Sequence, residues 1–144
     1  MAVTMQFYEQ FLVNVGNGNI NLSSDTFKVI LVNSYSFDAA HDEKTDVVAS
    51  EIANGNGYTT GGEAITSQSW AWDGADSRVE FDGADITWTA SGGSIGPATG
   101  AIVYSDTSTN DKLMAYIDFG GSETAGDGTD FKITWHADGI FVIA

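Results

Sequence analysis

Residues 26–32 (TFKVILV) form the longest nearly unbroken β-branched and apolar run in the chain, with turn formers on both sides at residues 23–25 (SSD) and 33–34 (NS). A short run of this composition is typical of a strand buried on both faces, because β-branched side chains have stiff χ1 angles and pack well on a pleated surface. A similar run recurs at residues 130–135 (DFKITW). The two runs predict a single β core.

The length and the turn residues indicate the fold class. At 144 residues we expect one domain, residues 1–144, because a chain of this length can bury its own core. Seventeen glycines against a single proline, Pro97, indicate many tight turns. Alternating segments between those turns predict an all-β fold, a jelly-roll-like β-sandwich of about eight or nine short antiparallel strands.

Two segments depart from this strand pattern. Apolar residues at helical spacing, from Met5 through Phe11 to Val15, predict one short N-terminal helix over about residues 4–15. Residues 120–128 contain four glycines and no large apolar side chain, which predicts an exposed, mobile loop.

The charge balance excludes several classes of partner. Twenty acidic residues face five Lys and Arg, a formal net charge of −15, whereas nucleic-acid binding requires clustered cations. No apolar stretch approaches the ~20 residues of a membrane-spanning helix, so we expect neither nucleic acid nor membrane as a partner. An acidic surface of this kind resists aggregation or docks on a basic partner. Cysteine is absent, which excludes disulfides and thiolate metal sites.

Candidate catalytic groups are few. The two histidines are His41 and His136, and His41 stands beside Asp42 and Glu43 in a polar segment. Three adjacent residues in extended backbone cannot all face one metal ion, and no spaced HExxH motif occurs. The sequence therefore predicts no enzyme, with no catalytic, cofactor-binding or metal-binding residues and no cofactor.

Two further groups have alternative interpretations. Asp and Gly cluster at residues 73–76, 82–85 and 127–130, where they are turn formers rather than a calcium loop, because the full calcium-binding spacing is missing. Trp70, Trp72, Trp88 and Trp135 could form an aromatic platform for sugars, but aromatic residues at alternating strand positions more often pack in a core or an interface.

Several short segments follow one another in a recognisable order along the chain, namely residues 11–12 (FL), 20–29 (INLSSDTFKV), 57–62 (GYTTGG), 81–88 (FDGADITW), 101–106 (AIVYSD), 113–120 (LMAYIDFG), 131–135 (FKITW) and 138–140 (DGI). In this order they resemble a family of small structural proteins of tailed-phage virions, the head decoration or capsid cement proteins. The resemblance implies a β-rich module without chemistry that binds the major capsid protein and stabilises the shell.

The expected function follows from this resemblance. We expect a non-enzymatic virion protein on the outer capsid surface, made in the host cytoplasm and assembled as a homotrimer. The alternative is a carbohydrate-binding module of a host-recognition fibre that uses surface tryptophans, and a small hydrolase ranks last. The position of the tryptophans discriminates, since two or more in a row on an open face would favour sugar binding.

Overall fold

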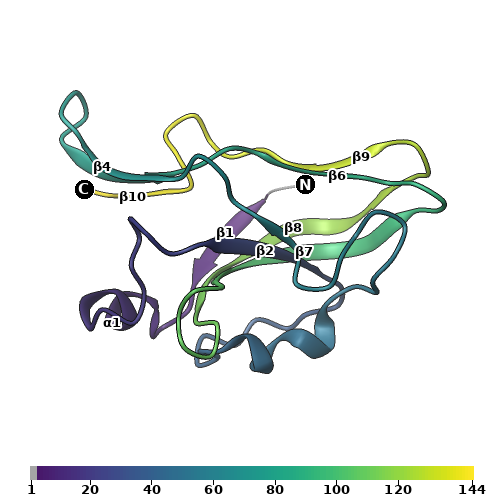
Figure 1. The fold of residues 1–144 in the computed structure, drawn as a ribbon, viewed down its shortest axis with the longest axis horizontal. Coiled ribbons are helices and arrows are strands. Elements are labelled where there is room, and N and C mark those ends of the chain that lie inside the picture. Colours follow the sequence, from purple (N-terminus) through teal and green to yellow (C-terminus); the bar gives the residue numbers. More distant parts are fainter. Residues whose placement is uncertain (1–2) are drawn as a thin grey trace.

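The computed structural model describes residues 3–144, which contain ten strands (Figure 1). The largest sheet has the order β1-β8-β7-β2-β3, a second has the order β10-β5-β4, and β6 pairs with β9; every pairing is antiparallel. The prediction of an all-β sandwich is confirmed.

The bounds of the elements are as follows. The five-stranded sheet contains β1 (Thr4–Phe7), β8 (Leu113–Ala125), β7 (Ile95–Ser105), β2 (Phe27–Val32) and β3 (Glu63–Ala64). The three-stranded sheet contains β10 (Phe141–Ile143), β5 (Arg78–Asp82) and β4 (Ser69–Asp73), and the two-stranded sheet contains β6 (Ile86–Thr89) and β9 (Asp130–Ile133). The helices are α1 (Phe11–Gly16) and the 3₁₀ turns η1 (Lys44–Asp46) and η2 (Val48–Ser50).

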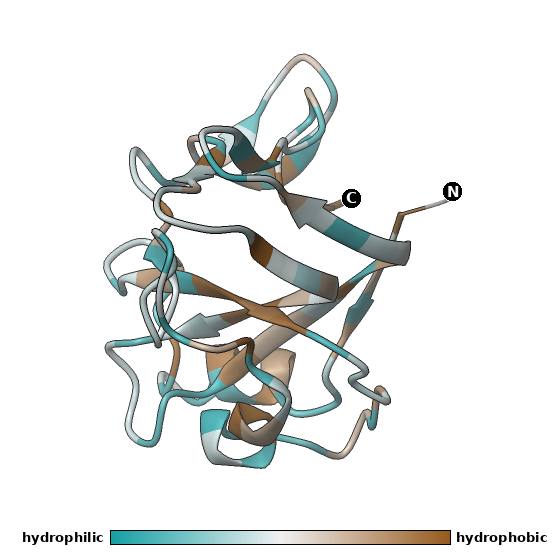
Figure 2. Ribbon diagram, turned by 90° about the vertical axis from the view of Figure 1, so that its right-hand side faces the viewer, coloured by the Kyte–Doolittle hydropathy of each residue, from teal (hydrophilic) through white to brown (hydrophobic). Residues whose placement is uncertain are grey.

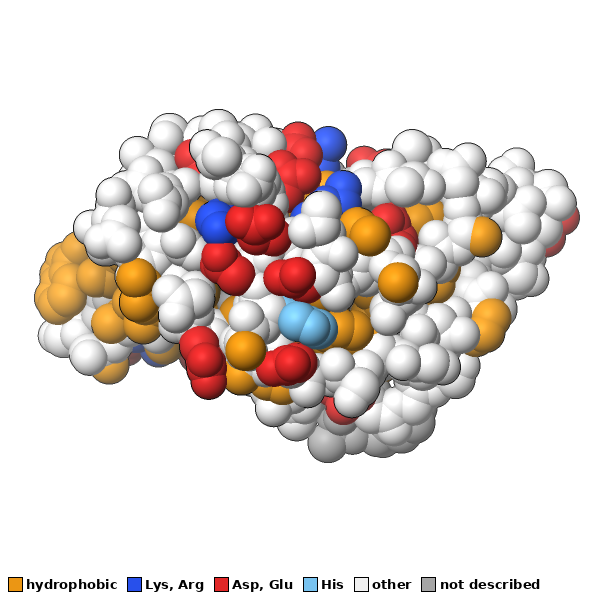
Figure 3. Space-filling view, turned by 90° about the horizontal axis from the view of Figure 1, so that it is seen from below, with side chains coloured by type: hydrophobic (Ala, Val, Ile, Leu, Met, Phe, Trp, Pro, Cys, Tyr) orange, Lys and Arg blue, Asp and Glu red, His pale blue; other side chains and the backbone are white. Residues whose placement is uncertain are grey.

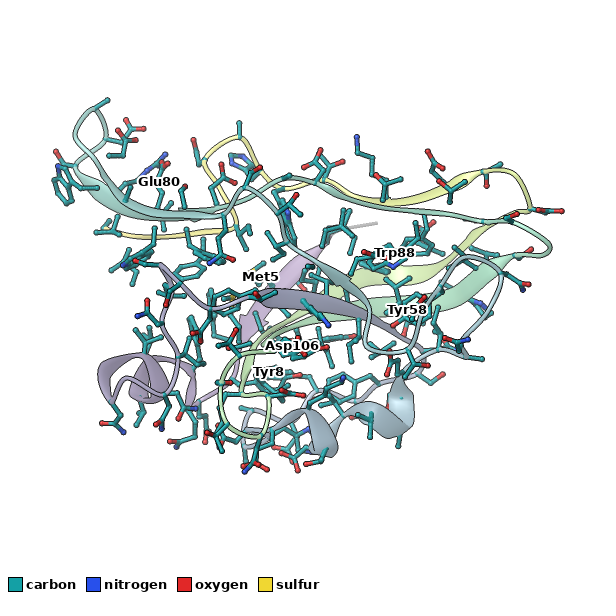
Figure 4. The ribbon with its side chains drawn as sticks, in the orientation of Figure 1. Met5, Tyr8, Tyr58, Glu80, Trp88 and Asp106 are labelled. Carbon is teal, nitrogen blue, oxygen red and sulfur yellow. The ribbon has the colours of Figure 1, made fainter. Side chains whose placement is uncertain are left out.

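The main core lies between two layers. The five-stranded sheet forms one layer and the two smaller sheets form the other, with apolar segments facing inward (Figures 1 and 2). Phe27 on β2 meets Phe81 on β5 with ring centroids 5.1 Å apart, and Trp88 on β6 is buried between the layers (Figure 4). The two layers are thus joined by large side chains from both.

Strand β2 is buried on both faces, as its composition predicted. Val29 and Leu31 point into the main core. Ile30 and Val32 alternate with them and join a second cluster on the opposite face of the sheet, together with Ile102. Residues 33–50 cover this second cluster. Val47 is one of its buried members, and the half-buried rings of Tyr35 and Phe37 pack against it.

The predicted N-terminal helix has the wrong bounds. Residues 4–7 form strand β1, which pairs with β8 from Thr4↔Asp118 to Phe7↔Ala115, and helix α1 begins only at Phe11. Helical spacing of the apolar residues did not predict the structure here. A short segment beside a partner strand gains its backbone hydrogen bonds from the sheet, even where its apolar residues repeat at helical spacing. Leu12, expected on the buried face of the helix, is 59% exposed.

The predicted loop over residues 120–128 is also wrong for most of its length. Strand β8 continues to Ala125, and the turn takes up only residues 126–129. Its far end pairs with β7 at Glu123↔Ala98 and Ala125↔Ile95, after a register shift that a bulge absorbs. The backbone of Gly120 has a φ of +74°, a conformation that glycine adopts readily.

Candidate interaction surfaces

All five cationic side chains contact groups of the protein itself. Lys28 lies 3.1 Å from Asp106, Lys112 lies 2.9 Å from Glu43, and Lys132 lies 3.6 Å from Asp85. Lys44 sits 4.7 Å above the ring of Tyr104. One face of the molecule shows lysines enclosed by carboxylates near its middle (Figure 3). Each cation therefore has a partner within the protein, some of them at the surface, and the excess charge is acidic.

Arg78 occupies the one group of carboxylates that could hold a metal ion in the part of the chain described. Oxygen atoms of Asp73, Asp76 and Glu80 lie within 4.8 Å of one another. The guanidinium nitrogen of Arg78 lies 2.7 Å from Glu80, 3.2 Å from Asp76 and 3.1 Å from Asp138. The guanidinium already supplies the positive charge that these oxygens need, so a bound cation would have to displace it.

The Asp and Gly residues of the β4–β5 turn act as turn formers, as the sequence indicated. Asp73 accepts a hydrogen bond from the backbone N–H of Ala75 at 2.9 Å. This hydrogen bond is the main reason that the pKa of Asp73 lies below its ordinary value, and Arg78 contributes less. The carboxylate therefore stabilises the turn conformation.

The two histidines lie in different layers and make different contacts. His41 is hydrogen bonded through Nδ1 to the hydroxyl of Tyr35 at 2.8 Å, and Tyr35 in turn bonds to Tyr8 at 3.0 Å. Burial raises the pKa of Tyr8 far above its ordinary value, so this hydroxyl stays protonated. His136 is exposed in the β9–β10 connection, 3.4 Å from Asp138. The chain Tyr8–Tyr35–His41 holds residues 33–50 against the second cluster.

A buried serine and aspartate also form a structural contact. The hydroxyl of Ser105, which is fully buried, donates to Asp25 at 2.8 Å, and Asp25 also accepts from the backbone N–H of Asn21 at 3.0 Å. The backbone N–H of Ser108 donates to Ser105 at 3.1 Å. Neither histidine is among these partners, and a fully buried hydroxyl is not placed to attack a substrate.

Sequence reasoning missed a tyrosine–glutamate network that fixes the loop beside β2. The hydroxyl of Tyr58 donates to Glu51 at 2.7 Å and accepts from the backbone N–H of Leu31 at 3.1 Å. Glu51 also accepts from the backbone N–H of Gly61, whose carbonyl accepts from Tyr104, both at 2.7 Å. The residues are far apart in the sequence and share no motif, so only the fold brings them together.

The four tryptophans do not form an open row. Trp88 is in the core, 2% exposed. Trp70 is half-buried against Phe141, with ring centroids 5.9 Å apart, and Trp135 is half-buried and donates to the carbonyl of Ala84 at 3.0 Å. Trp72 alone among the four is largely exposed, at 65%.

Trp72 belongs to an apolar surface at the free end of the three-stranded sheet. Cross-strand pairing aligns Trp70, Phe81 and Phe141 in one row over the core. The next row on the same face is Trp72, Val79 and Ile143, because residues two apart on a strand share a face. Ile143 is 43% exposed, so this second row extends beyond the core.

A side chain from β1 continues this surface. Phe7 packs on Phe141 with ring centroids 5.4 Å apart and is still 43% exposed. We call this surface the overhang patch, and its members are Phe7, Trp72, Val79 and Ile143. Helix α1, which exposes Leu12, lies at the same end of the molecule (Figure 1). An apolar surface of this kind marks an interaction site more often than a scattered exposed side chain does.

A second apolar feature is a groove between the layers, along the edges of β1 and β9. One part has a volume of about 490 Å³ and is lined by Met5, Ile117, Ile133 and Trp135 among others. The adjoining part, of about 390 Å³, shares Val3, Phe119 and Lys132 with it and ends at Glu123 and Asp130. We call the two parts together the edge groove.

Comparison with protein-family models, with curated proteins and with solved structures found no match to this chain. Among residues 3–144, no helix has the length and apolar character that crossing a membrane requires.

Proposed function

We propose that this protein is a non-enzymatic structural protein of a tailed-phage virion that binds the assembled capsid shell as a decoration protein. The observation that carries the proposal is the overhang patch, in which Phe7, Trp72 and Ile143 stay exposed while each of the protein's own cations has a partner within the protein. The similarity of segments such as residues 81–88 and 113–120 to decoration proteins supports the identity of the partner, the major capsid protein.

The clusters that could carry chemistry have structural roles, which also supports a binding function. Arg78 is surrounded by carboxylates, Ser105 is fully buried and donates to Asp25, and Glu51 holds a loop through Tyr58. Binding to the shell but not to its free subunits would stabilise the shell by mass action. A partner surface with an apolar centre and a basic rim would complement the patch and the acidic surface around it.

The proposal includes self-assembly into a homotrimer on the outer capsid surface. Three copies bring together a formal charge of −45, three times −15, which opposes association. Apolar contact must then dominate, with carboxylates held apart by more than the Debye length of ~8 Å at physiological salt. Trimer formation should therefore strengthen as salt is raised from low values, which sedimentation across a salt series would measure. A protein that stays monomeric at every salt concentration would limit the trimer to the shell surface.

Shell binding itself is tested by cosedimentation of the protein with expanded shells of the capsid protein encoded in the same genome. We expect saturable binding and a higher melting temperature of the decorated shell. Ile143→Ser should weaken binding about tenfold, as expected for loss of an apolar contact at an interface centre. Val142→Ser is the matched control, because Val142 has similar exposure but faces the opposite side of β10. Equal binding to shells of an unrelated phage would refute the proposal.

A carbohydrate-binding module is the alternative, and the exposed ring of Trp72 is the observation that favours it. Trp72→Ala would then abolish binding to a host polysaccharide in a glycan-binding assay. If the protein is a decoration protein, the same variant binds shells more weakly, and the wild-type protein shows no binding in the glycan assay.

A further inference from the structure

Two strand edges without partners flank the edge groove. Strand β1 is an edge strand of the five-stranded sheet. Strand β9 pairs with β6 in the two-stranded sheet, so within residues 3–144 each of β1 and β9 has one unpaired side. Both strands run in the same direction along the groove, from right to left in Figure 1. The side chain of Met5 lies between the layers at this opening (Figure 4).

Alternation along each strand shows which backbone groups are free. The N–H of Tyr8 donates to the carbonyl of Met114 at 3.2 Å, so the backbone groups of Tyr8 and, two residues earlier, of Gln6 face β8. The backbone groups of Met5 and Phe7 therefore face the opposite side, which is the open edge of β1. Ala90 N–H donates to the carbonyl of Thr129 at 2.8 Å, which places the groups of Asp130 and Lys132 on the open edge of β9 in the same way.

We propose that the edge groove binds an extended polypeptide segment from another protein, by strand addition, with apolar side chains at alternate positions facing into the groove and basic residues at its C-terminal end. An extended segment satisfies free edge groups through its main chain and fills a groove with alternate side chains. The inference concerns the class of ligand and holds whichever protein supplies the segment.

The direction follows from the two strands. Antiparallel pairing is two to three times more common than parallel pairing, and because β1 and β9 run the same way, one segment can be antiparallel to both. Its C-terminal end then lies near Val3 and Asp130, where the groove ends.

Charge complementarity is the reason to place basic residues at the C-terminal end of the bound segment. Glu123 and Asp130 line the groove there, and Lys132, which also lines it, lies 3.6 Å from Asp85. Arginine or lysine at the C-terminal end of the segment would therefore meet two carboxylates, one of which, Asp130, accepts from the hydroxyl of Thr89 at 2.8 Å.

The test uses the full chain, labelled with ¹⁵N, and a capped peptide of about eight residues, long enough to span a strand. The peptide has valine at alternate positions, threonine between them and two arginines at the C-terminus. We expect a Kd of about 10–100 μM, with amide shifts at Val3, Met5 and Lys132. A peptide with the arginines at the N-terminus should bind about fivefold more weakly, because it meets the carboxylates only in the parallel direction.

Matched variants separate the groove from general charge attraction. Glu123→Lys should weaken binding about fivefold, while Glu9→Lys, the same charge change at an exposed residue outside the groove, should leave the Kd within about twofold. Val3→Ser should also weaken binding, and Val48→Ser, at an exposed valine on η2, should not.

Three results would overturn the inference. The first is absence of binding up to about 1 mM peptide. The second is equal binding of a peptide of the same composition with its valines adjacent, because alternation would then play no role. The third is equal weakening by Glu9→Lys and Glu123→Lys, or amide shifts that lie outside the groove.

Discussion

The five-stranded and the three-stranded sheets contain strands of similar composition that end up in different surroundings. In the five-stranded sheet, β2 and β7 have apolar side chains on both faces, and both faces are covered by other parts of the chain. In the three-stranded sheet, one row is covered by the core and the next row on the same face, with Trp72 and Ile143, remains exposed. Apolar strand residues therefore indicate that a face is to be covered, but not whether the same chain covers it.

The largest expected effect is on the free energy of unfolding, and it is measured by one substitution in each of the two sheets. Ile102→Ala on β7, where the side chain is fully buried, should lower the free energy of unfolding by about 2–5 kcal/mol, because it removes apolar contacts and leaves a cavity. Ile143→Ala on β10 should lower it by less than about 1 kcal/mol. Urea denaturation measures both. Equal losses would show that the three-stranded sheet is covered in solution, by another copy or by a rearranged segment.

The next effect tests the close packing around β2. Gly62 and Gly18 have nearly the same φ, +75° and +78°, but a Cβ at Gly62 would lie only 1.8 Å from the carbonyl oxygen of Val29, whereas nothing lies near Gly18. Gly18→Ala should cost about 1 kcal/mol from backbone strain alone. Gly62→Ala should cost about 3 kcal/mol or more, because the loop must also move away from β2. Similar values for the two would mean that this loop is not held against the strand.

A smaller effect compares the ion pairs of the two sheets. Arg78→Met removes the charge that holds Asp76, Glu80 and Asp138 together, and these like charges then repel. We expect a measurable fall in melting temperature. Lys28→Met on β2 removes one partly exposed pair with Asp106 and should leave the melting temperature unchanged within error. A stabilised Arg78→Met variant would contradict the role assigned to the guanidinium.

The smallest effect is pH-dependent and concerns the segment that covers the five-stranded sheet. The backbone N–H groups of Asp42 and Glu43 hold the pKa of Asp46 below its ordinary value of 3.8. A carboxyl group whose pKa is lower in the folded than in the unfolded state stabilises the folded protein at pH values above its unfolded-state pKa. This stabilisation is lost as the pH falls through the folded-state pKa. Asp46→Asn should therefore cost less than about 1 kcal/mol near neutral pH, since the group is exposed, and nothing at low pH. Urea denaturation of both proteins at several pH values would show the difference, and a constant difference would exclude this origin.

The fold class could be predicted because the strongest strands carry their signal locally. Residues 26–32 combine β-branched residues with flanking turn formers, and they form a strand buried on both faces. The turn at residues 73–76 was equally local, since Asp73 bonds to the backbone two residues on. Each of these features depends on few neighbours, so the sequence alone indicates it.

The features that could not be predicted depend on distant partners. Met5 has helical spacing to Tyr8 and Phe11, yet β1 forms because residues 115–118 offer it a sheet edge. The glycines at 120–121 suggested a loop, but β7 holds the end of β8 in the sheet. The overhang patch and the edge groove arise where the layers end, and no local pattern marks that position.

The pairing of β1 with β8 also sets the order in which the chain can fold during synthesis. The partner of Thr4 is Asp118, so the first strand waits until more than a hundred further residues have left the ribosome. Strand β10 also pairs with a distant segment, since Phe141 lies opposite Phe81 on β5, sixty residues earlier. Because the long loops between these segments must close before the contacts form, we expect both pairings to be late and slow steps of folding. Until then the edges of β5 and β8 are exposed, and the high negative charge helps the nascent protein to avoid aggregation.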